Sequence, residues 1–159
     1  MIKYYTHKEI NKRLWDECIT ESFNGRIYSY SWYLDSIVES WGALILDDYK
    51  AVFPLPFRRK SGIDYIFQPK FIQQLGLFSR VPLSPALLEE FLNCIPSNFK
   101  LIDLNLNQHN TLYSSRIYSK KRINIEMDLL GGYDQLRNTY STNLKRNLKR
   151  AAEAKLTVF

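Results

Sequence analysis

Hydrophobic and polar positions along this chain change their spacing several times, and each change marks an expected structural element. Near the N-terminus, apolar residues recur every three or four positions, which is the pattern of amphipathic helices. From Gly42 onward they alternate with polar residues, which indicates strands. In chain order we expect a strand at 1–5, helices at 7–22 and 28–40, strands at 42–46, 49–58, 63–67 and 71–78, a helix at 84–95, strands at 100–106 and 122–129, a short helix from Tyr133, and a helix at 140–155.

Local signals sharpen several of these boundaries. Thr6 and Glu9 have the spacing of a capping box, and Ser84 before Pro85 is typical of a helix start. The strands over 43–78 are predicted to form one continuous antiparallel meander. Its predicted core positions are Val52, Leu55, Ile66 and Leu75. Prolines lack a backbone donor and so predict edge positions or bulges at Pro54, Pro56 and Pro69.

The order of these elements, β-α-α followed by a run of strands and then α-β-(α)-β, predicts an α/β (α+β) domain. It would have a mixed, mostly antiparallel sheet flanked by helices. A chain of 159 residues with 45% hydrophobic residues is long enough to bury such a core. The pattern alone leaves several other α/β and α+β folds open.

Charge is unevenly distributed along the chain. Twenty-two Lys and Arg residues against sixteen Asp and Glu give a net charge of +6, which favours anionic partners. The excess is concentrated at 137–150, a stretch without acidic residues. Its cations are Arg137, Lys145, Arg146, Lys149 and Arg150.

The stretch at 140–155 combines this charge with helical periodicity. Leu144, Leu148 and Ala151 fall on one predicted face. The opposite face carries Lys145, Arg146, Lys149 and Arg150. Like charges four residues apart repel by roughly 0.2–0.5 kcal/mol per pair, and a bound anion would relieve that repulsion. The alternative is an ordinary solvated helix face.

The same stretch resembles the helix that joins the two halves of FemAB/FemX-like transferases. The resemblance rests on Ser141, Asn143 to Ala151, and the closing strand-like Leu156 to Val158. It departs at Lys155, where the family usually has a glycine that would end the helix. Proteins of this family are tandem GNAT-like (acyl-CoA N-acyltransferase-like) domains that add amino acids or acyl groups to amines.

The resemblance implies a GNAT-like N-terminal domain at 1–132. Residues 133–159 would then be a connecting helix and the first strand of a second GNAT-like domain that this chain lacks. The implied function is the acceptor-binding half of an acyl or aminoacyl transferase, inactive alone. The acceptor would be an anionic small molecule or a peptide-like molecule. The donor of the full-length protein would be acyl-CoA or aminoacyl-tRNA, and tRNA would be a partner in the second case.

Cofactor chemistry is not expected in this half. In a GNAT-like domain, which the resemblance implies, a coenzyme A site needs a glycine-containing loop after the fourth strand, whose free backbone N–H groups hold the pyrophosphate. The junction at 77–85 has no glycine, and Pro82 and Pro85 remove two donors. His7 and His109 are not at metal-ligand spacing, so neither a metal site nor a catalytic residue is predicted.

Further candidate binding residues lie in the predicted meander. Arg58 and Arg59 belong to a basic loop that continues to Gly62 and would give a second anion contact or a solvated hairpin tip. Of Gln73 and Gln74, alternation sends one inward, where it would bind a substrate amide or satisfy a bulge. Gln74 is the candidate.

Two other functions remain open on the sequence. A basic helix near Tyr133 and Tyr140 would suit a nucleic-acid-binding module, although no aromatic residue lies between Lys145 and Arg150. The chain could also be a structural half without a ligand. Two cysteines without CxxC spacing, Cys18 and Cys94, predict reduced core residues, and the lack of a secretion signal or long apolar run predicts a cytoplasmic protein.

Overall fold

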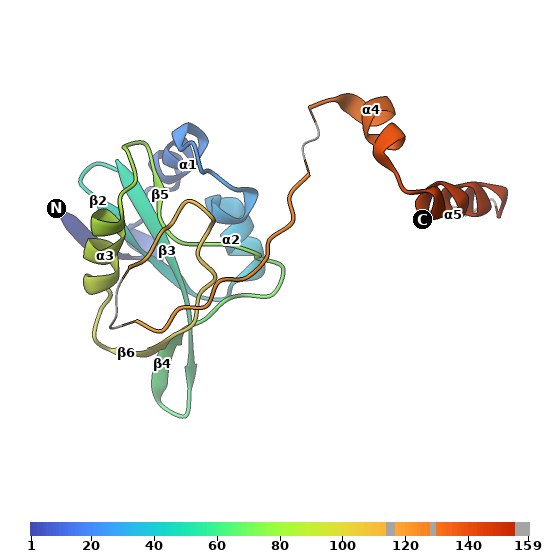
Figure 1. Ribbon diagram of the computed structural model, residues 1–159. Coiled ribbons are helices and arrows are strands. Elements are labelled where there is room, and N and C mark those ends of the chain that lie inside the picture. The colour runs from blue at the N-terminus through green and yellow to red at the C-terminus, as the bar shows by residue number, and fades with distance from the viewer. Residues whose placement is uncertain (114–116, 128–129, 155–159) are drawn as a thin grey trace. The chain divides into compact units, whose positions relative to one another are not determined.

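The computed structural model describes residues 1–113, 117–127 and 130–154 (Figure 1). The chain divides into two compact units, Met1–Ser119 and Lys120–Phe159. The predicted domain boundary after residue 132 stays a prediction. Each unit is described by itself.

Unit 1 begins with β1 (Ile2–Thr6), a 3-10 helix at His7–Glu9, α1 (Lys12–Glu21), a second 3-10 helix at Ile27–Ser29, and α2 (Ser31–Ile37). It continues with β2 (Trp41–Leu46), β3 (Ala51–Lys60), β4 (Ile63–Ile66), β5 (Phe78–Ser79), α3 (Pro85–Asn93) and β6 (Phe99–Ile102). It is a mixed α/β structure whose mostly antiparallel sheet is flanked by helices.

The described strands form one sheet with the order β1-β2-β3-β4-β6, and β5 pairs with β3 beside β4. Neighbours are antiparallel except β4 and β6, which run parallel. A parallel pair needs a crossover, and α3 lies in that connection. β3 is therefore the central strand, with β2 along one edge and β4 and β5 sharing the other.

The prolines of β3 lie where that second edge is open. The Phe57 N–H donates to the Ser40 carbonyl on the β2 side, so the alternating positions Pro54 and Pro56 turn their nitrogens away from β2. On that side β5 pairs only with Ala51 and Val52, and the pairing of β3 with β4 begins at Phe57. Prolines are tolerated in a central strand here because no ladder donor is required at those positions.

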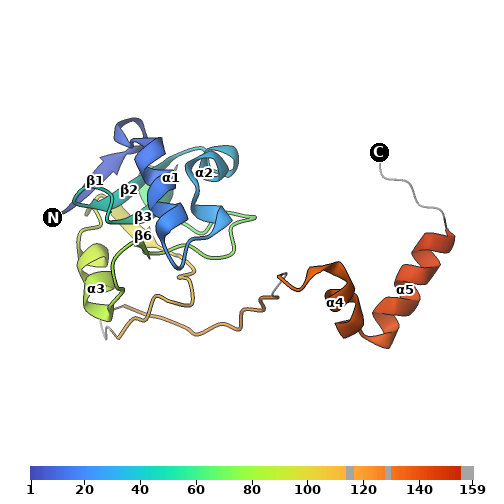
Figure 2. The same cartoon turned by 90° about the horizontal axis from the view of Figure 1, so that it is seen from above.

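Apolar side chains pack on both faces of the sheet. One cluster joins α1 and α2 to the sheet through Trp15, Leu34 and Trp41. The other joins α3 to the sheet through Phe53 and Phe91. The helices α1, α2 and α3 of unit 1 can be followed around the strands in Figure 2. Alternation along β2 sends Ala43 and Ile45 into the first cluster and Leu44 into the second. The four predicted core residues Val52, Leu55, Ile66 and Leu75 are all buried.

Both predicted caps are present. The Glu9 carboxylate accepts the Thr6 N–H at 2.8 Å, and the Leu87 N–H donates to the Ser84 hydroxyl at 3.1 Å. The helices that follow are shorter than predicted. α1 starts at Lys12, because the capping box closes only a 3-10 turn, and α2 ends at Ile37.

The continuous meander over 43–78 is a wrong prediction. After Ile66 the chain leaves the ladder and rejoins the sheet as a strand only at Phe78. Residues 67–77 are instead held by side-chain hydrogen bonds, which an apolar alternation does not reveal. The strand at 100–106 is also shorter than predicted, since β6 ends at Ile102, and Leu101 and Ile102 are exposed. Cys94, predicted to be a core residue, is exposed at the end of α3, whereas Cys18 is buried.

Unit 2 contains α4 (Gly132–Thr139) and α5 (Thr142–Glu153). The Ser141 hydroxyl caps α5 by accepting the Leu144 N–H at 3.2 Å. The strand predicted at 122–129 is absent over its described residues 122–127, where Ile123 and Ile125 are exposed without a neighbouring strand to pair with. Residues 128–129 of that prediction, and the predicted strand at 156–158 with Lys155, lie outside the described residues.

Candidate anion-binding pocket

The β3–β4 hairpin determines where its basic residues point. Successive side chains of a strand point to opposite faces, so Arg58 and Arg59 are separated although they are adjacent in sequence. Arg59 lies 3.7 Å from the Asp64 carboxylate. The guanidinium of Arg58 lies over the Phe67 ring, 4.4 Å from its centroid. Both belong to β3 itself, not to the loop the sequence suggested, and only Ser61 and Gly62 form the turn.

The segment after β4 is held in place by Gln68. Its amide oxygen accepts the Asn105 N–H at 2.9 Å, and its amide nitrogen donates to the Ile72 carbonyl at 2.7 Å. The side chain thereby replaces a missing backbone partner between the chain at 67–72 and the residues after β6. A well-fixed loop therefore faces the end of α2.

These elements line a partly open pocket, which we call the Arg58 pocket. It has a volume of about 480 Å³, within the range of small-molecule sites. Its lining consists of Ser36, Ile37, Arg58, Phe67, Gln68, Pro69, Lys70 and Phe71. Arg58 and Lys70 give it two cations, and neither has an ion-pair partner among the described residues. Such a pocket suits an anionic group, with Arg58 offering fork geometry and Lys70 a point charge.

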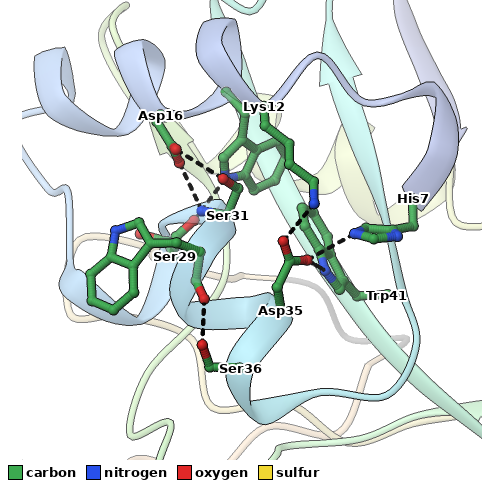
Figure 3. A network of polar contacts seen from close by, with 10 residues as sticks. His7, Lys12, Asp16, Ser29, Ser31, Asp35, Ser36 and Trp41 are labelled. Atoms are coloured by element: carbon green, nitrogen blue, oxygen red, sulfur yellow. Dashed lines mark hydrogen bonds and ion pairs between the residues drawn. The ribbon is translucent and has the colours of Figure 1, made fainter.

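A second polar cluster lies near the start of α1 (Figure 3). The Asp35 carboxylate accepts hydrogen bonds from Lys12 at 2.5 Å, His7 Nε2 at 2.8 Å and Trp41 Nε1 at 3.0 Å. Burial raises the pKa of the Asp35 carboxyl, but the hydrogen bonds from Lys12, Trp41 and His7 together outweigh it and hold this pKa below its ordinary value.

The His7–Asp35 pair has the form of a catalytic base with its orienting carboxylate. Among the described residues, however, His7 makes no hydrogen bond to a hydroxyl or thiol that it could activate. The cluster connects the segment before α1, through α2, to the buried Trp41 of β2. Its hydrogen bonds therefore tie these elements of the fold together.

The other predicted binding residues lie elsewhere. Gln74 points inward, as alternation suggested: it is 7% exposed, and its amide oxygen has no hydrogen-bond partner among the described residues. It does not line the Arg58 pocket. Gln73 is exposed, and its amide oxygen accepts the Tyr28 hydroxyl at 3.4 Å.

The four cations of the basic helix are all exposed on α5 in unit 2. Lys145 donates to the Asn138 carbonyl at 3.3 Å, and Arg146 donates to the Asn143 amide oxygen at 2.7 Å. Lys149 lies 3.9 Å from Glu153, which offsets part of the repulsion along the helix. Arg150 has no ion-pair partner in the described part of the chain. The apolar face with Leu144 and Leu148 is exposed as well.

The sequence indicated the charge of Arg58 but not its pocket. Phe67, Lys70 and Phe71 were missed because their approach to Arg58 depends on the chain leaving the ladder after Ile66. The one signal available was Pro69, which is incompatible with a ladder donor.

Comparisons of the chain with protein-family models, with curated proteins and with solved structures found no match. Within the described residues, no group of three or more His, Cys, Asp or Glu side chains is placed to hold a metal ion. None of the described helices has the length and apolar character needed to cross a membrane.

Proposed function

We propose that this chain is the acceptor-binding, non-catalytic half of an acyl or aminoacyl transferase with a GNAT-like fold. The resemblance of residues 141–151 to a FemAB-like connecting helix motivates the proposal. The order of elements up to β6 supports it in part, because one strand and two helices precede a run of strands that α3 and β6 follow. That run has four strands, β2 to β5, where the β-α-α-β-β-β-α-β series of a GNAT-like domain has three. The helices on both faces of the sheet agree with the same fold.

The junction between β5 and α3 is the observation that favours a non-catalytic half. Its backbone donors are largely engaged: the Arg80 N–H donates to the Lys50 carbonyl at 3.0 Å, and the Val81 N–H to the Ser79 hydroxyl at 3.1 Å. Pro82 and Pro85 have no N–H. A pyrophosphate needs several convergent N–H groups, and this junction offers too few.

The Arg58 pocket is the proposed site for the anionic group of the acceptor. Its two cations lack acidic partners among the described residues, and it is lined by residues fixed through Gln68. We place a second anion-binding surface on the basic face of α5. The two surfaces belong to different units and are tested separately.

Acetyl-CoA is expected not to bind this chain. The physical reason is the engaged and missing donors at 79–85, which leave the pyrophosphate without its usual partners. Isothermal titration calorimetry with acetyl-CoA should give no saturable heat. Micromolar binding that disappears when residues 79–85 are replaced would contradict the proposal that this half is non-catalytic.

Removing Arg146 and Arg150 together is expected to weaken pyrophosphate binding roughly tenfold. Each charge-assisted hydrogen bond contributes about 1.5–3 kcal/mol when shielded from water, and solvent screening of these exposed side chains leaves a total of about 1.4 kcal/mol for the pair. The measurement is titration calorimetry at low and high salt, and the affinity should fall as salt rises.

The matched control replaces Lys3 and Lys8, two exposed cations of unit 1, by alanine. Lys12 is unsuitable as a control because it binds Asp35. An equal loss of affinity in both double variants would show that net charge, and not α5, attracts the anion.

A further inference from the structure

Phe71 has a backbone conformation that its side chain disfavours. Its φ is +67°, in the left-handed region that bulky residues seldom adopt. Residues held there usually owe their conformation to surrounding contacts. Here the Phe71 carbonyl accepts the Tyr33 hydroxyl at 2.8 Å, and the next residue, Ile72, is bound by Gln68.

The ring of Phe71 gains no burial in return. The residue is 81% exposed, whereas its neighbour Ile72 is 3% exposed in the core. An asparagine would adopt this backbone conformation more readily. The fold of the loop therefore does not explain why a large aromatic side chain occupies this position.

The position of the ring suggests a different role. Phe71 lines the Arg58 pocket, whose wall also carries Arg58 and Lys70. Phe67 supports the guanidinium from one side at 4.4 Å, which orients its planar fork for a bidentate anion. A largely exposed aromatic residue thus lines the same pocket as two cations.

We propose that the Arg58 pocket binds a small organic anion that carries an aromatic or other flat apolar group. The anionic group contacts Arg58 and Lys70, and the flat group packs on Phe71. This inference rests on the proposed function only in taking the pocket as a ligand site. It adds the chemical class of the ligand, and it would hold for the chain without a second domain.

Three related probes separate charge from ring. Hippurate has both a carboxylate and a phenyl ring, N-acetylglycine has the carboxylate alone, and hippuramide has the ring without the charge. We expect hippurate to bind about tenfold more tightly than either of the others, because N-acetylglycine loses the ring contact and hippuramide loses the ion contact. Binding is measured by titration calorimetry or by NMR shifts of the pocket residues.

Two variants assign these contributions to residues. Phe71→Asn should abolish the preference for hippurate over N-acetylglycine while leaving the melting temperature unchanged or higher. Arg58→Gln should abolish the preference for hippurate over hippuramide. Lys60→Gln is the matched control, since Lys60 lies two residues further along the same face of β3 and does not line the pocket. It should bind hippurate like the natural chain.

The possible failures are distinct. If hippurate and N-acetylglycine bind equally well and both depend on Arg58, the pocket remains an anion site and the aromatic inference is wrong. If Phe71→Asn retains the preference for the ring, the inference is also wrong. If neither anion binds, both the inference and the use of this pocket in the proposed function are overturned.

Discussion

Replacing Leu75 by alanine is expected to lower the free energy of unfolding by about 2–5 kcal/mol. Leu75 is fully buried and packs in the cluster that joins α1 and α2 to the sheet. Its backbone also pairs with the segment after β6: the Leu75 N–H donates to the Asn105 carbonyl at 2.7 Å, and its carbonyl accepts the Asn107 N–H at 2.8 Å. The surrounding chain is fixed on both sides, so the site cannot collapse to fill the cavity.

Thermal and urea unfolding measure this effect. Leu101→Ala is the matched control, because Leu101 lies in the same sheet but is 60% exposed. Surface substitutions of that kind usually change stability by less than about 0.5 kcal/mol. Equal shifts in both variants would mean that Leu75 does not face the core.

The sequence predicted the parts of unit 1 that depend on local signals. Ser84 caps α3 because its hydroxyl reaches a donor three residues ahead, which is visible in the sequence. Val52 and Leu55 are buried as predicted, β2 and β3 pair, and the turn between them follows Leu46. Alternation was sufficient there because the strand neighbours are also sequence neighbours.

The segment at 67–77 could not be predicted in this way. Its apolar residues alternate as in a strand, but many of its hydrogen bonds go to partners 30 or more residues away. Asn24 and Asn110 both donate to the Leu77 carbonyl, and Gln68 binds the Asn105 N–H. Side chains that replace ladder partners leave no periodic pattern in the sequence.

The candidate site was predictable only in its charges. Arg58 and Arg59 are equivalent in the sequence, yet strand alternation gives Arg58 the pocket and Arg59 an ion pair. His7 and Asp35 are 28 residues apart and come together through α1 and α2. Gln74 is buried, as the alternation suggested, but it does not line the pocket, because the chain leaves the ladder after β4.

Gly76→Ala is expected to be as damaging as the loss of Leu75. Gly76 has a φ of +109°, and a Cβ there would lie 2.2 Å from the Asn110 amide oxygen. That oxygen accepts the Leu77 N–H at 2.7 Å, so moving Asn110 leaves a buried donor without a partner. Backbone strain of about 1–3 kcal/mol and an unsatisfied donor of about 1–3 kcal/mol together predict a loss of about 2–6 kcal/mol.

Two comparisons divide this loss into its causes. Gly62→Ala has a similar backbone conformation, with φ +80°, but nothing lies within 4 Å of its added Cβ, so it reports strain alone, roughly 1–2 kcal/mol. Combining Gly76→Ala with Asn110→Ala removes the obstruction. The double variant should therefore lose less unfolding free energy than the sum of the losses in the two single variants. Equal destabilisation by Gly76→Ala and Gly62→Ala would show that the Asn110 side chain can move away from the added Cβ without a loss of unfolding free energy. The asparagine contacts would then not be what holds residues 75–77 against the sheet, and the fixed geometry argued for this segment would have to come from the packing of Leu75 and Leu77 alone.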